Sequence, residues 1–158
     1  MISVFDNLLV TSPNAGGIFF VHGGVVQKLD ALDSTGLSVA GRSVLRGIQP
    51  SLVVLYQGTP TDINPTDIPF GDVHDVLIDG DAFYLVGTQG NEVVKFDAAA
   101  IETGRWTLPG EDDAWHVNCL AKWNGKLVFS AFGEFSVHRQ YKGRTKGAGF
   151  VQDLDMPI

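Results

Sequence analysis

Two histidines stand at matching places in two stretches of alternating apolar residues. His74 begins one predicted strand and His116 directly precedes another, and polar neighbours, Asp75 and Asn118, lie close by. Neutral imidazole and carboxylate groups suit zinc, iron, nickel or manganese. If the two strands are neighbours, these side chains predict a divalent metal site or an acid-base group. The other interpretation, which is favoured, is that each histidine caps a strand or bonds to the backbone of a neighbouring sheet.

Two residues beside His116 have simpler interpretations. Trp115 could stack on a sugar or another ring, although packing between sheets is favoured. Cys119 lies within an apolar strand, where a thiol behaves as a small core hydrophobe. The cysteine is three positions from the histidine, so the two side chains point to opposite faces of a strand, which argues against a nucleophilic pair.

Charged residues gather in two segments. Four basic residues among flanking glycines predict a site for a phosphate or carboxylate, with a solvated loop as the alternative: Arg139, Lys142, Arg144 and Lys146. The acidic run Glu111-Asp112-Asp113 suits Ca²⁺ or simply water, and water is favoured. His22 and His138 share no motif and are interpreted as surface or structural residues.

The composition excludes several classes of protein. The formal net charge of -7 repels phosphate backbones, so nucleic acid is not an expected partner. The longest apolar runs are far shorter than the roughly 18 residues that a membrane helix needs. The single cysteine cannot form an internal disulfide, and the N-terminus lacks a signal-peptide pattern, so a reducing, cytoplasmic setting is expected.

The elements that must position these residues form an internal repeat. The segment from Thr35 to Leu45 aligns without a gap with that from His74 to Tyr84, glycine on glycine. Asp79-Gly80, and Asn124-Gly125 in a third copy, are strong signals for two-residue hairpin turns, because type I′ turns need positive φ at both central residues. Each copy therefore predicts a strand, a tight turn and a strand.

The repeats predict an all-β chain of a single domain. Four copies cover approximately residues 2–30, 36–68, 74–106 and 116–155, and a repeat of about 40 residues is typical of a β-propeller or partial propeller. A β-sandwich of the same hairpins is the alternative. The expected segments between blades are Asp30 to Ser34, Thr59 to Asp72 and Thr107 to Asp113.

The chain also resembles an uncharacterised bacterial family, a conserved domain of unknown function with propeller-like repeats. Four stretches carry the resemblance, the last two being the most specific: residues 73–76, 87–94, 112–120 (DDAWHVNCL) and 142–149 (KGRTKGAG). Members of that family are about twice as long, so the resemblance implies that this chain is similar to their N-terminal half. It brings no known reaction.

A half-length ring would leave two blades with open edges. A homodimer that completes the propeller is the expected answer, with a small closed propeller or a truncated chain as alternatives. The expected function is a non-catalytic binding or assembly module for a small anionic or sugar-like ligand or a protein. The alternative is a metal-dependent or acid-base enzyme, which requires His74 and His116 to converge rather than to be satisfied separately by backbone groups.

Overall fold

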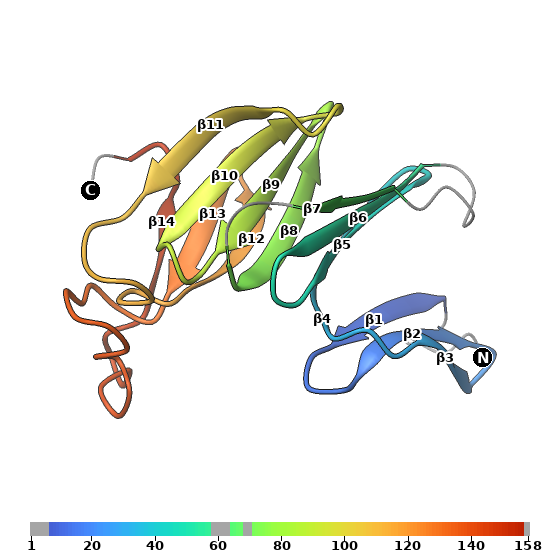
Figure 1. Cartoon of the computed structure of the whole chain (residues 1–158), viewed down its shortest axis with the longest axis horizontal. Coiled ribbons are helices and arrows are strands. Elements are labelled where there is room, and N and C mark those ends of the chain that lie inside the picture. Colours follow the sequence, from blue (N-terminus) through green and yellow to red (C-terminus); the bar gives the residue numbers. More distant parts are fainter. Residues whose placement is uncertain (1–6, 58–63, 68–70, 157–158) are drawn as a thin grey trace.

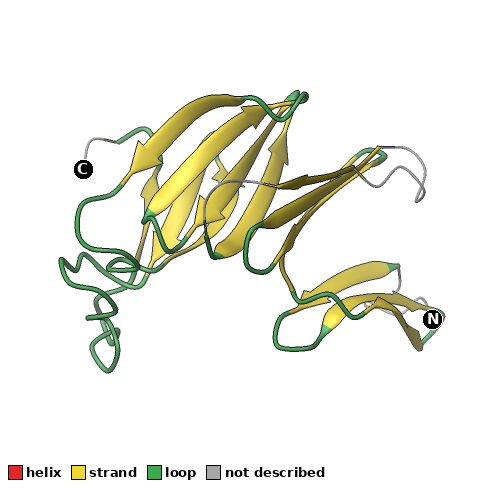
Figure 2. Cartoon of the chain, in the orientation of Figure 1, coloured by secondary structure: helices red, strands yellow, loops and turns green. Residues whose placement is uncertain are grey.

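The computed structural model describes residues 7–57, 64–67 and 71–156, and these form strands, turns and loops without any helix (Figures 1 and 2). No segment among them is therefore a helix that could cross a membrane. The strands are β1 (Leu8–Ser12), β2 (Gly17–His22), β3 (Val25–Asp30), β4 (Ser34–Ala40), β5 (Ser43–Ile48), β6 (Leu52–Gln57), β7 (Asn64–Asp67), β8 (Val73–Asp79), β9 (Ala82–Gly87), β10 (Glu92–Asp97), β11 (Glu102–Thr107), β12 (Val117–Trp123), β13 (Lys126–Ala131) and β14 (Phe150–Asp153).

The strands form four antiparallel sheets, each of which takes its strands in chain order. The sheets are β1-β2-β3, β4-β5-β6-β7, β8-β9-β10-β11 and β12-β13-β14. The first strand of each sheet lies beside the first strand of the next, so β1, β4, β8 and β12 follow one another through the molecule (Figure 1). This is the arrangement of consecutive propeller blades, and the predicted fold class is confirmed.

The tight turns follow the sequence with one correction. Trp123 pairs with Lys126, and Asn124 and Gly125 both have positive φ, as a type I′ turn requires. In the Asp79-Gly80 hairpin, however, Asp79 still belongs to the ladder and pairs with Ala82. The central residues are therefore Gly80 and Asp81, of which only Gly80 has positive φ, so a type I′ turn over Asp79-Gly80 is wrong.

The expected boundaries agree with the sheets in part. The links Asp30 to Ser34 and Thr107 to Asp113 join consecutive sheets. The expected link Thr59 to Asp72 is only partly described, and four of its residues form β7, the fourth strand of its blade, because they pair with β6. The start of the first expected copy, residues 2–6, lies outside the described residues.

The core lies between the sheets, because the central strands are buried on both faces. In β9, Phe83 and Leu85 pack toward the second sheet, whereas Tyr84 and Val86 pack toward the fourth. Because both faces of β9 are covered, apolar residues follow one another along it, as in the sequence FYLV. The first sheet differs, since Val25 and Val26 at its edge are about two-thirds exposed.

Polar contacts join neighbouring blades at one end of their first strands. The residue after the second strand of one blade donates to the carbonyl of the residue that opens the next blade. Gln49 Nε2 donates to Val73 O at 2.7 Å, and Thr88 Oγ1 donates to Val117 O at 2.5 Å. Each bond satisfies a carbonyl where the chain enters a new sheet, so the blades are held in register.

Candidate functional site

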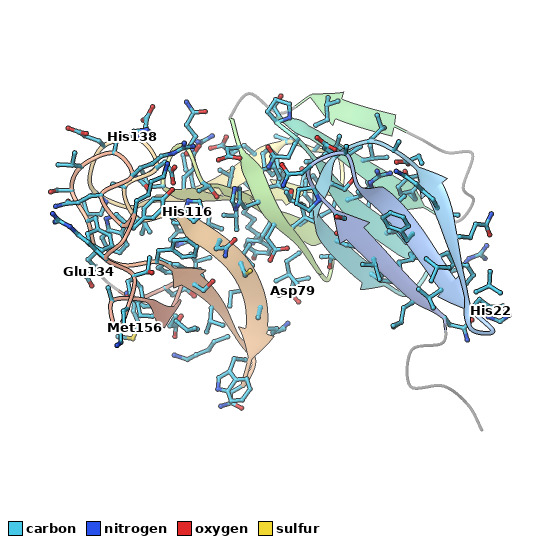
Figure 3. All side chains as sticks on the ribbon, turned by 90° about the horizontal axis from the view of Figure 1, so that it is seen from below. His22, Asp79, His116, Glu134, His138 and Met156 are labelled. Atoms are coloured by element: carbon cyan, nitrogen blue, oxygen red, sulfur yellow. The ribbon has the colours of Figure 1, made fainter. Side chains whose placement is uncertain are left out.

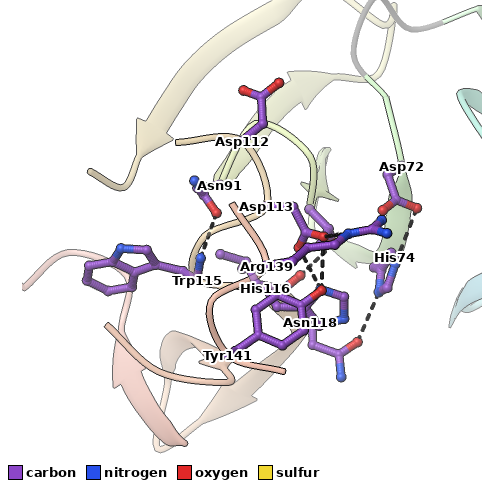
Figure 4. A network of polar contacts seen from close by, with 12 residues as sticks. Asp72, His74, Asn91, Asp112, Asp113, Trp115, His116, Asn118, Arg139 and Tyr141 are labelled. Carbon is purple, nitrogen blue, oxygen red and sulfur yellow. Dashed lines mark hydrogen bonds and ion pairs between the residues drawn. The ribbon is translucent and has the colours of Figure 1, made fainter. Parts of the chain in front are cut away.

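The structure brings the two predicted histidines together where β8 and β12 begin. The imidazole centroids of His74 and His116 are 5.0 Å apart, and the rings meet edge to face (Figure 4). Both side chains are mostly buried, with 22% and 15% of their surface exposed. The rings therefore converge, as the enzyme alternative requires, and within the described residues the contacts of their nitrogens are with side chains rather than backbone groups.

His116 owes its position to one extra residue at the start of its blade. In the third blade, Thr88 N donates to the carbonyl of Asp72, one residue before β8. In the fourth blade, Phe132 N donates to Trp115 O, two residues before β12. His116 is the residue in between, and its φ of 50° lies in the left-handed region that few non-glycine residues adopt. Such backbone strain is often found at functional sites.

A buried carboxylate organises the residues around His116. Asp113 is 2% exposed, and its Oδ1 accepts a hydrogen bond from His116 Nδ1 at 2.7 Å. Its Oδ2 accepts from Arg139 Nε at 2.6 Å and from the Tyr141 hydroxyl at 2.9 Å. Figure 4 shows these three donors converging on the one carboxylate. The segment after β13 therefore folds back to complete the site.

These contacts determine the charge of the Asp113 carboxyl group. Burial opposes its ionisation, but hydrogen bonds from His116, Arg139 and Tyr141 outweigh burial and lower its pKa. Burial and the hydrogen bond to Asp113 together raise the pKa of Tyr141 to about 12. At neutral pH the carboxylate is ionised and the phenol is protonated, so Tyr141 is a donor.

His74 lies between two acceptor oxygens. Its Nε2 is 3.3 Å from Asp72 Oδ1, and its Nδ1 is 3.2 Å from Asn118 Oδ1. Burial disfavours the charged imidazolium, but hydrogen bonds to Asp72 and Asn118 and the nearby negative charges outweigh it and raise the pKa of His74. The hydrogen bond from His74, despite burial, lowers the pKa of Asp72. This pair therefore favours a positively charged imidazole.

Asp75 does not join the histidines. Its Oδ2 accepts from the backbone N of Leu120 at 2.8 Å, so it connects β8 to β12. Burial raises the pKa of Asp75, against hydrogen bonds from Leu120 and Val76 that lower it. The side chain alternates away from His74 along the strand and has a bonding role between blades.

The two residues interpreted as core have different outcomes. Trp115 is 3% exposed and meets Phe150 edge to face, which confirms packing rather than stacking on a ligand. Cys119 is exposed, so its assignment to the core is wrong. It lies on the face of β12 opposite to the buried Leu120, and no further sheet of the described chain covers that face. Burial nonetheless raises the pKa of the thiol, which does not favour a nucleophile.

The predicted anion site is divided by the fold. Arg139 is bound to Asp113 and is 47% exposed. Lys142, Arg144 and Lys146 are exposed in successive turns that follow it. The guanidinium is therefore already neutralised by a carboxylate, and anion binding by the other three residues stays a prediction.

An open cavity of about 650 Å³ lies beside the histidine cluster. Its wall contains Asp72, Gln89, Glu111, Asp112, Asp113, His138 and Arg139. His138, interpreted from the sequence as a surface or structural residue, lines this cavity and donates from Nδ1 to Asp112 O at 2.7 Å. Figure 3 places His138 near His116, with His22 at the opposite end of the molecule.

The metal prediction has limited support. In the described ranges, no three or more histidine, cysteine, aspartate or glutamate side chains are arranged to hold a metal ion. The acidic run is also divided, because Asp113 bonds to His116 while Asp112 lines the cavity. A metal at His74 and His116 stays a prediction that requires a ligand from elsewhere.

Sequence reasoning missed the partners of the histidines. Asp72 was assigned to a link between blades, Asp113 to a solvated acidic run and Arg139 to an anion site, and Tyr141 was given no role. The available signal was the matching position of Asp72 and Asp113, each a short distance before the strand of its histidine. The contribution of Tyr141 needs the return of a distant loop, which no local pattern reveals.

Comparisons with known proteins support the fold. Neither the protein-family models nor the curated proteins contain a match. The β-propeller domain of Swd1 from Myceliophteria thermophila has a TM-score of 0.54 and 12% identity, over 84% of this chain and 50% of that one. The calcium-binding protein regucalcin from Agrobacterium tumefaciens has a TM-score of 0.59 and 18% identity, over 89% and 52%. Virginiamycin B lyase from Staphylococcus aureus has a TM-score of 0.55 and 13% identity, over 94% and 55%.

The chain spans about half of the length of these solved structures. The TM-scores show a shared fold, whereas identities below 20% say nothing of function, which has to be argued from the site. The described sheets are therefore consecutive blades of a partial β-propeller.

Proposed function

We propose that the chain is a propeller-type binding module whose cavity beside the histidine cluster takes a small, hydroxyl-rich, sugar-like ligand. The observation that carries this proposal is the mixture of acceptors and donors on one wall. Asp72, Glu111 and Asp112 supply carboxylate oxygens, while Gln89 and Arg139 supply N–H groups. A volume of about 650 Å³ is within the range of small-molecule sites.

The charge of the wall favours a neutral ligand over an anion. The cavity has four carboxylate residues and one arginine, and that arginine is bound to Asp113. A phosphate or carboxylate ligand would face net repulsion there. Hydroxyl groups, in contrast, donate to carboxylates and accept from amide and guanidinium groups. Of the two expected ligand classes, the sugar-like one fits better.

The structural neighbours are consistent with binding without deciding it. Regucalcin is a calcium-binding protein and virginiamycin B lyase is an enzyme, so this fold supports both kinds of function. The relation to the uncharacterised bacterial family, and a homodimer, remain proposals.

The test is titration of the ¹⁵N-labelled chain with glucose, galactose and mannose, and separately with phosphate and citrate. We expect a sugar to shift the amide signals of Gln89 and Asp112. Asp112→Asn should weaken this binding about tenfold, the value of one hydrogen bond to a charged group. Glu134→Gln, the same chemical change in a different surface hollow, should leave it unchanged. Shifts caused by phosphate or citrate and not by any sugar would contradict the proposal.

A further inference from the structure

The contact with Asp113 determines which nitrogen of His116 carries the proton. An ionised carboxylate can only accept hydrogen bonds, and its Oδ1 is 2.7 Å from His116 Nδ1. Nδ1 is therefore the protonated nitrogen of the neutral ring. Nε2 then carries a lone pair, and its direction is fixed by the ring orientation that Asp113 imposes.

Nε2 of His116 reaches solvent. Across residues 7–57, 64–67 and 71–156, every buried side-chain nitrogen or oxygen has a hydrogen-bond partner. The hydrogen bonds of His116 within these ranges involve only Nδ1, so Nε2 has no partner there. Nε2 is therefore not among the fully buried atoms, and 15% of the side-chain surface of His116 is exposed. The lone pair is thus available to a molecule from outside.

Three aromatic rings and a carboxylate hold the imidazole in place. The centroids of Phe132 and Tyr141 are 4.3 and 4.6 Å from that of His116, and His74 is at 5.0 Å. The ring therefore has little freedom to rotate away from Asp113. Tyr141 and Arg139 in turn hold the carboxylate through its other oxygen. A fixed imidazole with an ionised partner is the usual arrangement of a general base.

We propose that His116 is a proton acceptor for a hydroxyl group of a ligand, with Asp113 as its positioning residue. In this step the O–H bond breaks while the lone pair of Nε2 forms an N–H bond. The ligand oxygen is left negative, and the imidazolium is left positive next to the Asp113 carboxylate. Return of the proton restores both groups. The two histidines then differ in role, because His74 in its imidazolium form donates from both nitrogens to Asp72 and Asn118 and offers no lone pair.

The test is modification of the folded full chain by diethyl pyrocarbonate, an electrophile that acylates unprotonated imidazole nitrogen. Mass spectrometry of peptides gives the rate for each histidine between pH 6 and 8. His138 is the internal reference, because its Nδ1 also donates to an oxygen, Asp112 O, and the residue is exposed. We expect His116 to react within about tenfold of His138, and His74 at least tenfold more slowly than His116.

Two variants test whether the reactivity of His116 depends on Asp113 or only on the exposure of its ring. Asp113→Asn should slow the reaction of His116 severalfold, since an amide no longer fixes the Nδ1–H form. Glu134→Gln, the same carboxylate-to-amide change in a different surface hollow, should leave the rate within about twofold. If Asp113→Asn does not fold, the long-range ¹H–¹⁵N spectrum of the unaltered chain decides, and a proton on Nε2 of neutral His116 would overturn the proposal. So would equal rates for His74 and His116. The labelling needs no ligand in the cavity, so its outcome is independent of the sugar titration.

Discussion

The junction between the second and third blades and that between the third and fourth are built on one plan, and the later one adds a histidine bound to a buried carboxylate, His116 with Asp113. In both, the residue after the second strand, Gln49 or Thr88, donates to the first carbonyl of the next blade. The later junction adds His116, the extra residue before β12, and Asp113 to hold it. One inserted residue thus converts a structural joint into a candidate site.

Removal of the buried carboxylate should have the largest effect on the later junction. Asp113→Ala leaves the donors of His116, Arg139 and Tyr141 without their common acceptor. We expect unfolding to become easier by about 3 kcal/mol, as for other disrupted buried ion pairs. Chemical denaturation measures this value. Asp112→Ala, the adjacent carboxylate, should cost no more than about 0.5 kcal/mol, and an equal loss in both variants would contradict the assigned network.

The shared bond should be worth about the same in the two junctions. Gln49→Ala and Thr88→Val each remove the donor to one strand-opening carbonyl. Each should cost about 1 kcal/mol in denaturation experiments, the net value of one hydrogen bond, because Thr35 Oγ1 still donates to Val73 O in Gln49→Ala. A loss of stability in Thr88→Val alone would mean that the equivalent hydrogen bonds of the two junctions do not contribute equally to folding.

The ion pair between Asp72 and His74, at the start of the third blade, should make stability depend on pH. His74 binds its proton more tightly when folded, so its contribution is complete below the unfolded pKa of about 6.5 and is lost as pH rises through the higher folded value. The depressed pKa of Asp72 contributes above about 3.8 and is lost as pH falls through the folded value. The pair therefore acts mainly between pH 4 and 6.5.

His74→Gln should consequently destabilise the chain more at pH 5.5 than at pH 8.5. Denaturation of both proteins at the two pH values measures the difference, and it should be smaller than the loss in Asp113→Ala. His138→Gln, a histidine on the exposed cavity wall, is the control for a general effect of imidazole loss. A larger loss at pH 8.5 would give the coupling the opposite sign.

A comparison of the two junctions also shows which features of the fold and of the site could be predicted from the sequence. The hairpins and the repeat come from signals such as Asn124-Gly125 and the gapless alignment of residues 35–45 with residues 74–84, and they determine the fold class. The repeat made a meeting of His74 and His116 possible, since both stand where the first strands of neighbouring blades begin. The repeat did not reveal the partner set, because Arg139 and Tyr141 return from beyond β13. Whether Cys119 was buried depended on a neighbouring sheet that the pattern of one strand cannot reveal.

The open face of the fourth sheet is the position of the next junction and should show the smallest effect on folding. Trp123 and Val151 are both 69% exposed there, in contrast to the buried Trp115 on the other side of the blade. Trp123→Ser should change the free energy of unfolding of a monomer by no more than about 0.5 kcal/mol. If a second copy covers this face, as the homodimer expectation requires, the same change should lower the dimer fraction in light scattering over a range of concentrations. A monomer mass for the unaltered chain at every concentration would refute the homodimer, and the open face would then be available to a different partner.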